Sequence, residues 1–339
     1  MRGPERAHRT RSRGRACVVV LCSVLVVAGA CGSESGGEAT AGSSGDSRDP
    51  NGASPLAVAA AEPLPEPVQA VDIDGLDYSF NISPDPSSGL RAGWTLVRFH
   101  NVGVEAHQVM FARLKDGVDF AEMAAAGSGD SSGSSAIEFV DMLGGVSYIN
   151  AGHDTTALVN LPEGVVLAMC YVPNAEGVAH ALLGMSTVLT VGPAAAATGG
   201  DAEPAPAIDV GRRHDVGTIE LAADGYRFPA DLVPGWYHVV NTDTGDPAKG
   251  LHEMALMRLD EPVDAAAVSQ MVDDLANNVT PEVGLDAVGG MGAISAGFDG
   301  YLYLDLDPGQ YLAVDFMPDP GEPRPHMLDG YYASFTVAE

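Results

Sequence analysis

The sequence is poor in basic residues. Its 339 residues contain 17 Lys and Arg against 46 Asp and Glu, which gives a net charge of −29 at pH 7. A surface of this charge repels the phosphate backbone of nucleic acids, so we expect no nucleic-acid partner. Aromatic residues are also few, whereas 41 Gly and 23 Pro favour a loop-rich β protein over a helical bundle. The hydrophobic share of 46% is large enough for a core and excludes global disorder.

The apolar run near the N-terminus is too short to cross a membrane. It covers residues 16–30, and a spanning helix needs roughly 20 residues. A head rich in Arg precedes it and small residues end it, so we predict a secretory signal over 1–30. Val27-Ala28-Gly29-Ala30-Cys31 resembles the lipobox of bacterial lipoproteins, which implies lipidation of Cys31 and a membrane anchor on the extracytoplasmic face. Because Ala28 departs from the usual Leu or Val, secretion without a lipid is the alternative. The Gly-, Ser-, Ala- and acid-rich segment that follows predicts a disordered tether over 31–69.

Cysteine is scarce. Of the four cysteines, Cys17 and Cys22 lie in the predicted signal and Cys31 is the predicted lipidation site. Cys170 is then the one thiol of the folded region, which excludes a fold held by disulfides. A lone thiol in an exported protein calls for a chemical role.

An internal repeat with an offset of 145 residues organises the rest of the chain. We therefore predict two copies of one domain, over 70–193 and 207–339, joined by a linker over 194–206. The matched segments are 107–114 with 252–259, 118–119 with 263–264, 144–145 with 289–290, 167–173 with 312–318, and, after one inserted residue, 180–184 with 326–330.

Each copy shows the pattern of short strands. Runs of β-branched and apolar residues are bounded by Asn, Pro, Gly and Asp. They lie at 94–99, 109–114, 156–161, 165–172, 186–191, 301–306 and 311–314. Helical spacing appears once in each copy, over 119–126 and after Pro262. We predict an all-β fold of two tandem Greek-key β-sandwiches, each with a short helical insertion.

Copy one contains four potential metal ligands, which are, in chain order, His107, Cys170, His180 and Met185. Asn101-Val-Gly-Val-Glu-Ala-His107 and the Cys-His-Met order resemble the cupredoxins, the blue-copper family, over about 90 residues. The resemblance implies a cupredoxin-like fold in which His107, Cys170 and His180 bind one type 1 copper and Met185 is a weak axial ligand. Two imidazoles and a thiolate suit both oxidation states of copper. The nine residues between Cys170 and His180 make a longer loop than in the small cupredoxins.

Copy two carries His252, Asp315, His326 and Tyr331 at the matching positions. Without the thiolate and the thioether, a blue-copper site is excluded there. One hypothesis is that His252, Asp315 and His326 form a hard two-His-one-carboxylate site for Zn or Cu(II). The alternative is a polar cluster without a metal, which would show that this fold does not need copper.

Enzymatic activity is not expected. Multicopper oxidases and nitrite reductases place a His directly before the Cys, whereas Met169 precedes Cys170 and the chain has no His-x-His pair. We therefore predict an exported, lipid-anchored cupredoxin-like protein that binds one copper in copy one for electron transfer or copper holding. The alternative is a metal-free lipoprotein that binds a partner protein outside the cytoplasm. The sequence does not identify the redox or binding partner.

Overall fold

The structure is a computed structural model that describes residues 62–129, 134–194, 209–211, 214–245, 250–277, 279–322 and 324–338. The predicted signal over 1–30, Cys31 and most of the tether and linker lie outside the described residues. Within these ranges, no helix combines the length and the apolar character that a membrane crossing requires.

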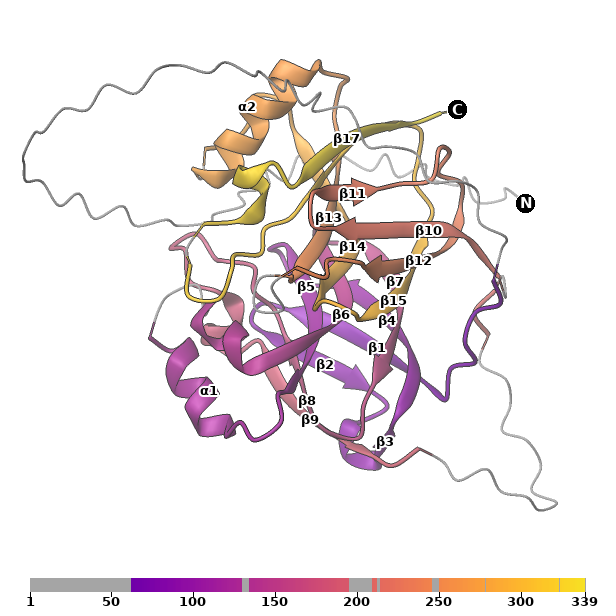
Figure 1. The fold of residues 1–339 in the computed structure, drawn as a ribbon, viewed down its shortest axis with the longest axis vertical. Helices are drawn as coiled ribbons and strands as arrows, with labels where there is room; N and C mark the ends of the chain where they lie inside the picture. The colour runs from indigo at the N-terminus through magenta and orange to yellow at the C-terminus, as the bar shows by residue number, and fades with distance from the viewer. Residues whose placement is uncertain are drawn as a thin grey trace, which may run out of the picture.

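The described part of the chain is built mainly from strands, with one α-helix in each copy, which confirms the all-β fold class (Figure 1). Copy one contains β1 (Gln69–Leu76), β2 (Ser79–Ser83), β3 (Leu90–Arg91), β4 (Gly93–Asn101), β5 (His107–Leu114), α1 (Phe120–Gly127), β6 (Val140–Ile149), β7 (Asp154–Leu161), β8 (Gly164–Met169) and β9 (Ser186–Gly192). Copy two contains β10 (Asp215–Ala222), β11 (Gly225–Arg227), β12 (Gly235–Asn241), β13 (His252–Leu259), α2 (Ala265–Ala276), β14 (Leu285–Ile294), β15 (Asp299–Leu304), β16 (Gly309–Val314) and β17 (Tyr332–Val337). Short 3₁₀ helices are η1 (Pro86–Ser88), η2 (Ser134–Phe139), η3 (His180–Leu183) and η4 (His326–Asp329).

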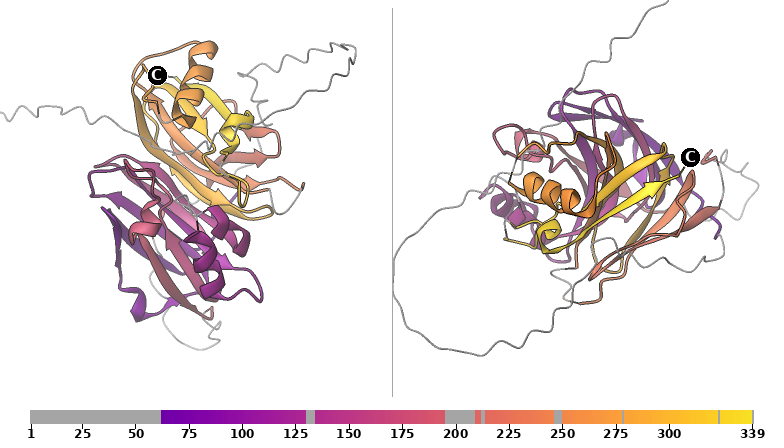
Figure 2. Two further views of the ribbon diagram at one scale, coloured as in Figure 1. Left: turned by 90° about the vertical axis from the view of Figure 1, so that its left-hand side faces the viewer. Right: turned by 90° about the horizontal axis from the view of Figure 1, so that it is seen from above.

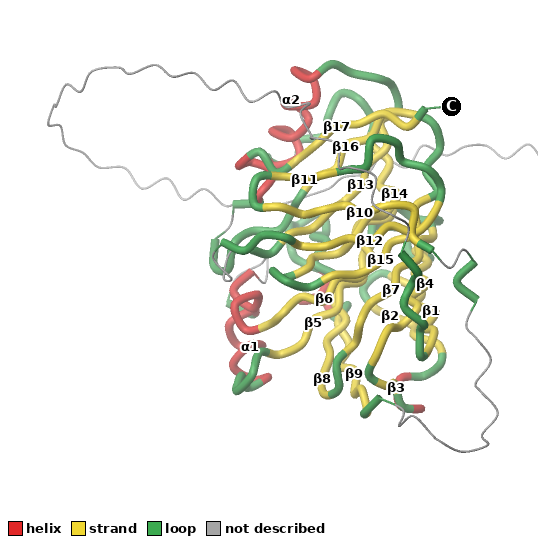
Figure 3. The backbone as a smooth tube through the Cα atoms, turned by 45° about the vertical axis from the view of Figure 1, so that its right-hand side comes forward, coloured by secondary structure: helices red, strands yellow, loops and turns green. Residues whose placement is uncertain are grey.

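Both sheets run through both copies. One sheet has the strand order β11-β10-β12-β15-β7-β4-β1-β2, and the other has the order β17-β16-β13-β14-β6-β5-β8-β9-β3. The strands follow one another as a continuous stack along the molecule (Figure 3). The left view of Figure 2 shows copy one in indigo and magenta directly against copy two in orange and yellow. The two copies are therefore joined through their sheets and not only through the linker.

Equivalent strands of the repeat pair across this junction. Val146 of β6 faces Met291 of β14, which is its own repeat equivalent 145 residues later. In the other sheet, Ala157 of β7 likewise faces its equivalent Leu302 of β15. The flanking β6–β14 pairs exchange when the copies are exchanged, since Leu143 pairs with Ile294 and Ile149 with Val288. The copies are therefore related by an approximate two-fold axis through the junction.

The repeated glycine pair makes this junction close. Gly144 and Gly145 have positive φ angles of 89° and 133°, which suit glycine. A Cβ on Gly145 would collide with the main-chain oxygen of Val109 on the neighbouring strand. A Cβ on Gly144 would touch Met291 of copy two at 3.3 Å. The pair produces an irregular register between β5 and β6, and the same arrangement recurs between β13 and β14.

Residues 62–68, which the sequence places in the tether, lie against the sheets. Pro63 bridges to His214 of copy two, and the N–H of Glu62 donates to Asp215 Oδ1 at 2.9 Å. The N–H of Val68 donates to the Trp94 carbonyl at 2.8 Å. This segment therefore contacts both copies before β1 begins.

Candidate metal centre

The structure brings His107, Cys170 and His180 together. His107 is the first residue of β5, Cys170 follows the last residue of β8, and His180 begins η3. The two Nδ1 atoms lie 3.2 Å apart, and Cys170 Sγ lies 3.6 Å from His180 Nδ1. All three side chains are fully buried, and their ligand atoms lie within 4.8 Å of one another. Residues separated by 73 positions in sequence thus present two nitrogens and a sulfur to one point.

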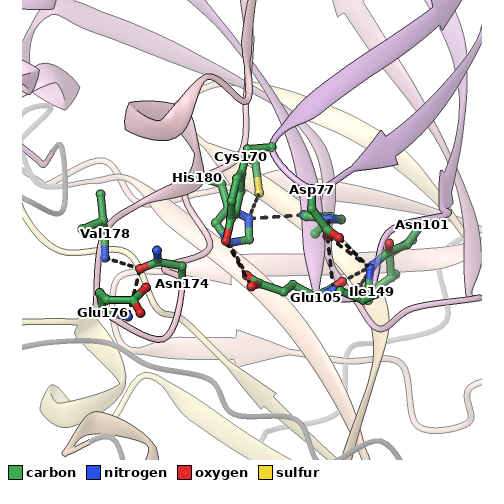
Figure 4. A network of polar contacts seen from close by, with 12 residues as sticks. Asp77, Asn101, Glu105, Ile149, Cys170, Asn174, Glu176, Val178 and His180 are labelled. Carbon is green, nitrogen blue, oxygen red and sulfur yellow. Dashed lines mark hydrogen bonds and ion pairs between the residues drawn. The ribbon is translucent and has the colours of Figure 1, made fainter.

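The loop between Cys170 and His180 is held by hydrogen bonds within the chain (Figure 4). Asn174 Oδ1 accepts from the N–H groups of Glu176 and Val178 at 3.0 and 2.9 Å, which turns the chain back. The N–H of His180 then donates to the Val172 carbonyl at 2.8 Å. The length of this loop is therefore compatible with convergence, because the Asn174 turn returns His180 to the thiol.

A second segment positions His107. Asn101 Nδ2 donates to the carbonyls of Glu105 and Ile149, both at 2.8 Å, and so ties residues 101–107 to the end of β6. Gly103 lies against the imidazole, because a Cβ there would be 2.6 Å from His107 Nε2. The Asn-x-Gly pattern before the histidine therefore has a packing reason.

Each imidazole has a carboxylate on its outward nitrogen. His107 Nε2 lies 2.9 Å from Asp77 Oδ1, and His180 Nε2 lies 2.9 Å from Glu105 Oε2. An N–H at Nε2 donates to a carboxylate, which leaves Nδ1 with its lone pair pointing inward. In that tautomer two lone pairs face each other at 3.2 Å beside a sulfur. A bound cation would remove this repulsion, so the donor set fits a metal.

Tyr78, in the turn between β1 and β2, covers the site. Its ring lies edge-on to His180 with the centroids 4.8 Å apart, and its hydroxyl donates to Glu105 Oε1 at 3.1 Å. Tyr78 has a φ of 91°, which is rare for a residue with a bulky side chain and costs of order 1–3 kcal/mol. The preceding residue is Asp77, so this strained turn supplies both the carboxylate on His107 and the ring on His180.

Burial controls the protonation of the three donors. It raises the pKa of the Cys170 thiol to about 12, so the sulfur is protonated at neutral pH without a cation. Burial also lowers the pKa of His107, although Asp77 opposes the effect. The pKa of His180 is lowered first by burial and then by the charge of His107. The site is therefore neutral imidazole and neutral thiol at pH 7, and binding a metal would release the thiol proton.

Met185 lies beside these residues in the fold. Its side chain is fully buried and belongs to the same apolar cluster as Cys170. The N–H of Met185 donates to the His180 carbonyl at 2.9 Å, and its own carbonyl accepts from the N–H of Cys170 at 3.1 Å. The backbone thus ties the fourth predicted ligand to two of the others.

The predicted set of copy two also converges. His252 begins β13, Asp315 follows β16 and His326 begins η4, as their counterparts do in copy one. Asp315 Oδ2 lies 2.9 Å from His252 Nδ1 and 3.0 Å from His326 Nδ1. Burial alone would raise the pKa of Asp315, but hydrogen bonds with the two imidazoles outweigh it and lower that pKa.

Sequence reasoning missed the carboxylates and the tyrosine around the first site. Asp77 and Tyr78 lie about 30 residues before His107, and no metal-ligand spacing points to them. A signal was present, since Tyr78-x-Phe80 matches Tyr226-x-Phe228 in the repeat. Glu105 lies inside the stretch that carries the family resemblance.

No family model matches the chain, and no curated protein sequence matches it. Solved structures to which the chain is similar include blue copper proteins and multicopper oxidases. Auracyanin from the photosynthetic bacterium Roseiflexus castenholzii is 15% identical, with 38% of this chain and 100% of auracyanin covered and a TM-score of 0.27. Auracyanin A, a "blue" copper protein from Chloroflexus aurantiacus, is 20% identical, with 36% and 97% covered and a TM-score of 0.25. A multicopper oxidase is 15% identical, with 83% and 94% covered and a TM-score of 0.23. At scores this low, the assignment of the site rests on the contacts within this chain.

Proposed function

We propose that the chain is an exported protein that binds one type 1 copper ion through His107, Cys170 and His180, with Met185 as the axial ligand. One observation carries the proposal. Two inward-facing Nδ1 atoms lie 3.2 Å apart beside a fully buried thiol, and both outward nitrogens are held by carboxylates. Two imidazoles and a thiolate form the trigonal donor set typical of blue-copper electron-transfer sites.

The charges around the site suit a cation. Asp77 and Glu105 add two carboxylates next to the imidazoles, and loss of the Cys170 proton adds a third negative charge. Burial alone would raise the pKa of Asp77, but N–H donors from residues 104 and 105 and the His107 imidazole outweigh it and lower the pKa. When bound, copper supplies a one-electron redox couple, and this chain supplies a dry donor set that is already positioned.

Hydrogen bonds within the protein hold the segments that carry the donors. The Asn174 turn fixes the loop to His180, and Asn101 fixes the segment before His107. Full burial of the three ligands keeps water away from the sulfur. A site held in this way changes little between oxidation states, which favours electron transfer.

Addition of Cu(II) to the protein tests this proposal. We expect an intense visible absorption from thiolate-to-copper charge transfer that is lost in Cys170→Ala. Removal of the exposed carboxylate in Asp116→Asn serves as the control and should leave the band unchanged. A colourless titration of the folded wild-type protein would contradict the proposal and favour the metal-free partner-binding alternative.

The same sample separates electron transfer from copper holding. Reversible bleaching and return of the band with a reductant and an oxidant supports an electron carrier. Loss of copper to a chelator without redox cycling supports copper holding. We further propose that the chain is not an oxidase, and dioxygen consumption with a phenolic substrate by the copper-loaded protein would contradict this.

The membrane anchor is a separate proposal that rests on the sequence around Cys31. A lipidated protein expressed in its host should partition into the detergent phase, and Cys31→Ala should shift it to the aqueous phase. Partition of the wild-type protein into the aqueous phase would instead support secretion without a lipid.

A further inference from the structure

The buried trio of copy two has the geometry of a metal site without the sulfur. His252 is 4% exposed and Asp315 is fully buried, and the ligand atoms of the trio lie within 4.8 Å of one another. Asp315 Oδ2 lies 2.9 and 3.0 Å from the Nδ1 atoms of His252 and His326. Donors that each lie about 2.0–2.2 Å from one tetrahedral zinc ion are themselves roughly 3.3–3.6 Å apart. The observed contacts are hydrogen-bond distances, and a shift of about 0.5 Å would let the same atoms share one ion.

The orientation of the two imidazoles is fixed from outside. His252 Nε2 lies 3.3 Å from Asp243 Oδ2, and His326 Nε2 lies 3.5 Å from Asp319 Oδ1. The ring of Tyr331 stacks on His252 with the centroids 4.0 Å apart. Carboxylates on the outward nitrogens direct both Nδ1 atoms toward Asp315, as Asp77 and Glu105 do for the imidazoles of copy one.

Asp315 also presents its carboxylate in one orientation. Its Oδ1 accepts from the N–H of Met317 at 2.9 Å, which leaves Oδ2 facing the two imidazoles. The carboxylate is thus held by the backbone on one side and offers a single oxygen to the site. An oxygen fixed in this way is a suitable ligand for a hard cation.

The charges of this cluster are unbalanced without a cation. Three carboxylates, those of Asp243, Asp315 and Asp319, surround two imidazoles. Neutral imidazoles would leave a net charge of −3 in a largely buried space, which is costly. Two added protons or one divalent cation reduce the charge to −1. The alternatives for copy two are therefore a doubly protonated ion-pair cluster and a metal site.

We propose that His252, Asp315 and His326 form a second metal site that takes a divalent cation such as Zn²⁺ or Cu²⁺, independent of copper in copy one. Two imidazoles and a carboxylate oxygen favour these cations and offer no thiolate that would favour Cu(I). The chain would then bind a redox-active ion in one copy and a second ion without a sulfur ligand in the other.

Zinc binding to the full chain tests this inference. Calorimetry on Cys170→Ala, which lacks the sulfur of copy one, should show one bound Zn²⁺ with release of protons. Adding Asp315→Asn should lower the zinc affinity more than about 100-fold. Loss of a residue that only orients the ligands typically lowers metal affinity about 10- to 100-fold, and loss of a ligand should exceed that. Asp305→Asn, which makes the same change at an exposed position, should leave the affinity unchanged.

Spectroscopy distinguishes the two sites. X-ray absorption at the zinc edge of Cys170→Ala should show nitrogen and oxygen neighbours, and those scatterers should be lost with Asp315→Asn.

Because Asp315→Asn could unfold copy two, circular dichroism checks the fold. Asp319→Asn provides a milder variant, with an expected loss of zinc affinity of about 10-fold. Absence of zinc binding by folded Cys170→Ala, or equal binding after Asp315→Asn, would overturn the proposal. Neither result would change the visible band of wild-type copper protein, so the two proposals can fail separately.

Discussion

The two copies place different chemistry on one backbone. In both, a histidine begins β5 or β13, a second donor follows β8 or β16, and another histidine begins η3 or η4. Copy one has the neutral thiol of Cys170 at the second position, and its imidazole nitrogens face each other at 3.2 Å. Copy two has Asp315 there, and one carboxylate oxygen lies between the two nitrogens. The residue at this position thus decides whether the site offers a soft sulfur ligand or a hard oxygen ligand.

The outward partners of the imidazoles differ in origin but not in kind. In copy one Asp77 comes from the β1–β2 turn and Glu105 from the segment before β5. In copy two Asp243 follows β12 and Asp319 lies in the loop before η4. The two copies therefore make the same type of contact from different positions. In each copy these carboxylates orient both imidazoles, with Nδ1 facing inward.

The largest expected effect comes from converting copy two into copy one. Asp315→Cys combined with Tyr331→Met gives copy two the donors of copy one. If the two backbones are equivalent, this variant should bind two copper ions and absorb about twice as strongly per chain in the visible. Asp315→Ala with Tyr331→Met is the matched control and should add no absorption. A double variant that folds and still binds a single blue copper would show that the loops before His180 and His326 differ in more than their donors.

The next effect concerns the carboxylates on the outward nitrogens. Asp77→Asn weakens the acceptor on His107 Nε2 and allows the other tautomer, so copper affinity should fall about 10- to 100-fold while the visible band keeps its position. Competition with a chelator of known affinity measures the change. Asp116→Asn, at an exposed position, should behave as the wild type. An unchanged affinity for Asp77→Asn would mean that packing alone orients His107.

Much of the fold could be predicted because strand signals are local. The runs at 94–99 and 109–114 became β4 and β5, since β-branched and apolar residues gather there between turn residues. Strand β6 was not predicted, because Gly144 and Gly145 interrupt it and glycine is depleted in strands. Those glycines are needed where β6 approaches β5 and copy two, and this contact is visible only in three dimensions.

The ligand sets could be predicted from order and repetition, whereas their surroundings could not. Each ligand matched a residue in the other copy, so the repeat itself identified the positions. The pairing of β6 with β14 and β7 with β15 leaves no comparable trace, because the residues of a buried strand do not indicate which strand pairs with it. Contacts between the copies depend on the fold of the whole chain.

The last prediction concerns the junction itself, where Gln108 in copy one corresponds to Glu253 in copy two. Both side chains are fully buried and adjoin the histidines of the two sites. With the Gln108 amide oriented so that its oxygen accepts from the N–H of Tyr171, its Nε2 donates to Glu253 Oε1 at 3.3 Å. Ser147 Oγ donates to the same oxygen at 2.7 Å. Complete burial raises the pKa of Glu253 well above its usual value. The folded protein therefore keeps this carboxyl protonated over a pH range in which the unfolded chain ionises it.

The sign of the resulting pH dependence follows directly. Below the ordinary pKa of a glutamate both states are protonated and the full stability is present, whereas stability falls as pH rises toward the raised folded pKa. Glu253→Gln should remove this dependence, so its free energy of unfolding relative to wild type should rise by up to about 1.4 kcal/mol per pH unit above that point. Urea denaturation at several pH values between acid and neutral measures the difference. The reverse change, Gln108→Glu, should steepen the loss of stability with pH, because it buries a second carboxyl at the equivalent position. Parallel curves for wild type and Glu253→Gln would show that Glu253 is ionised in the folded protein and that its neighbours compensate the charge.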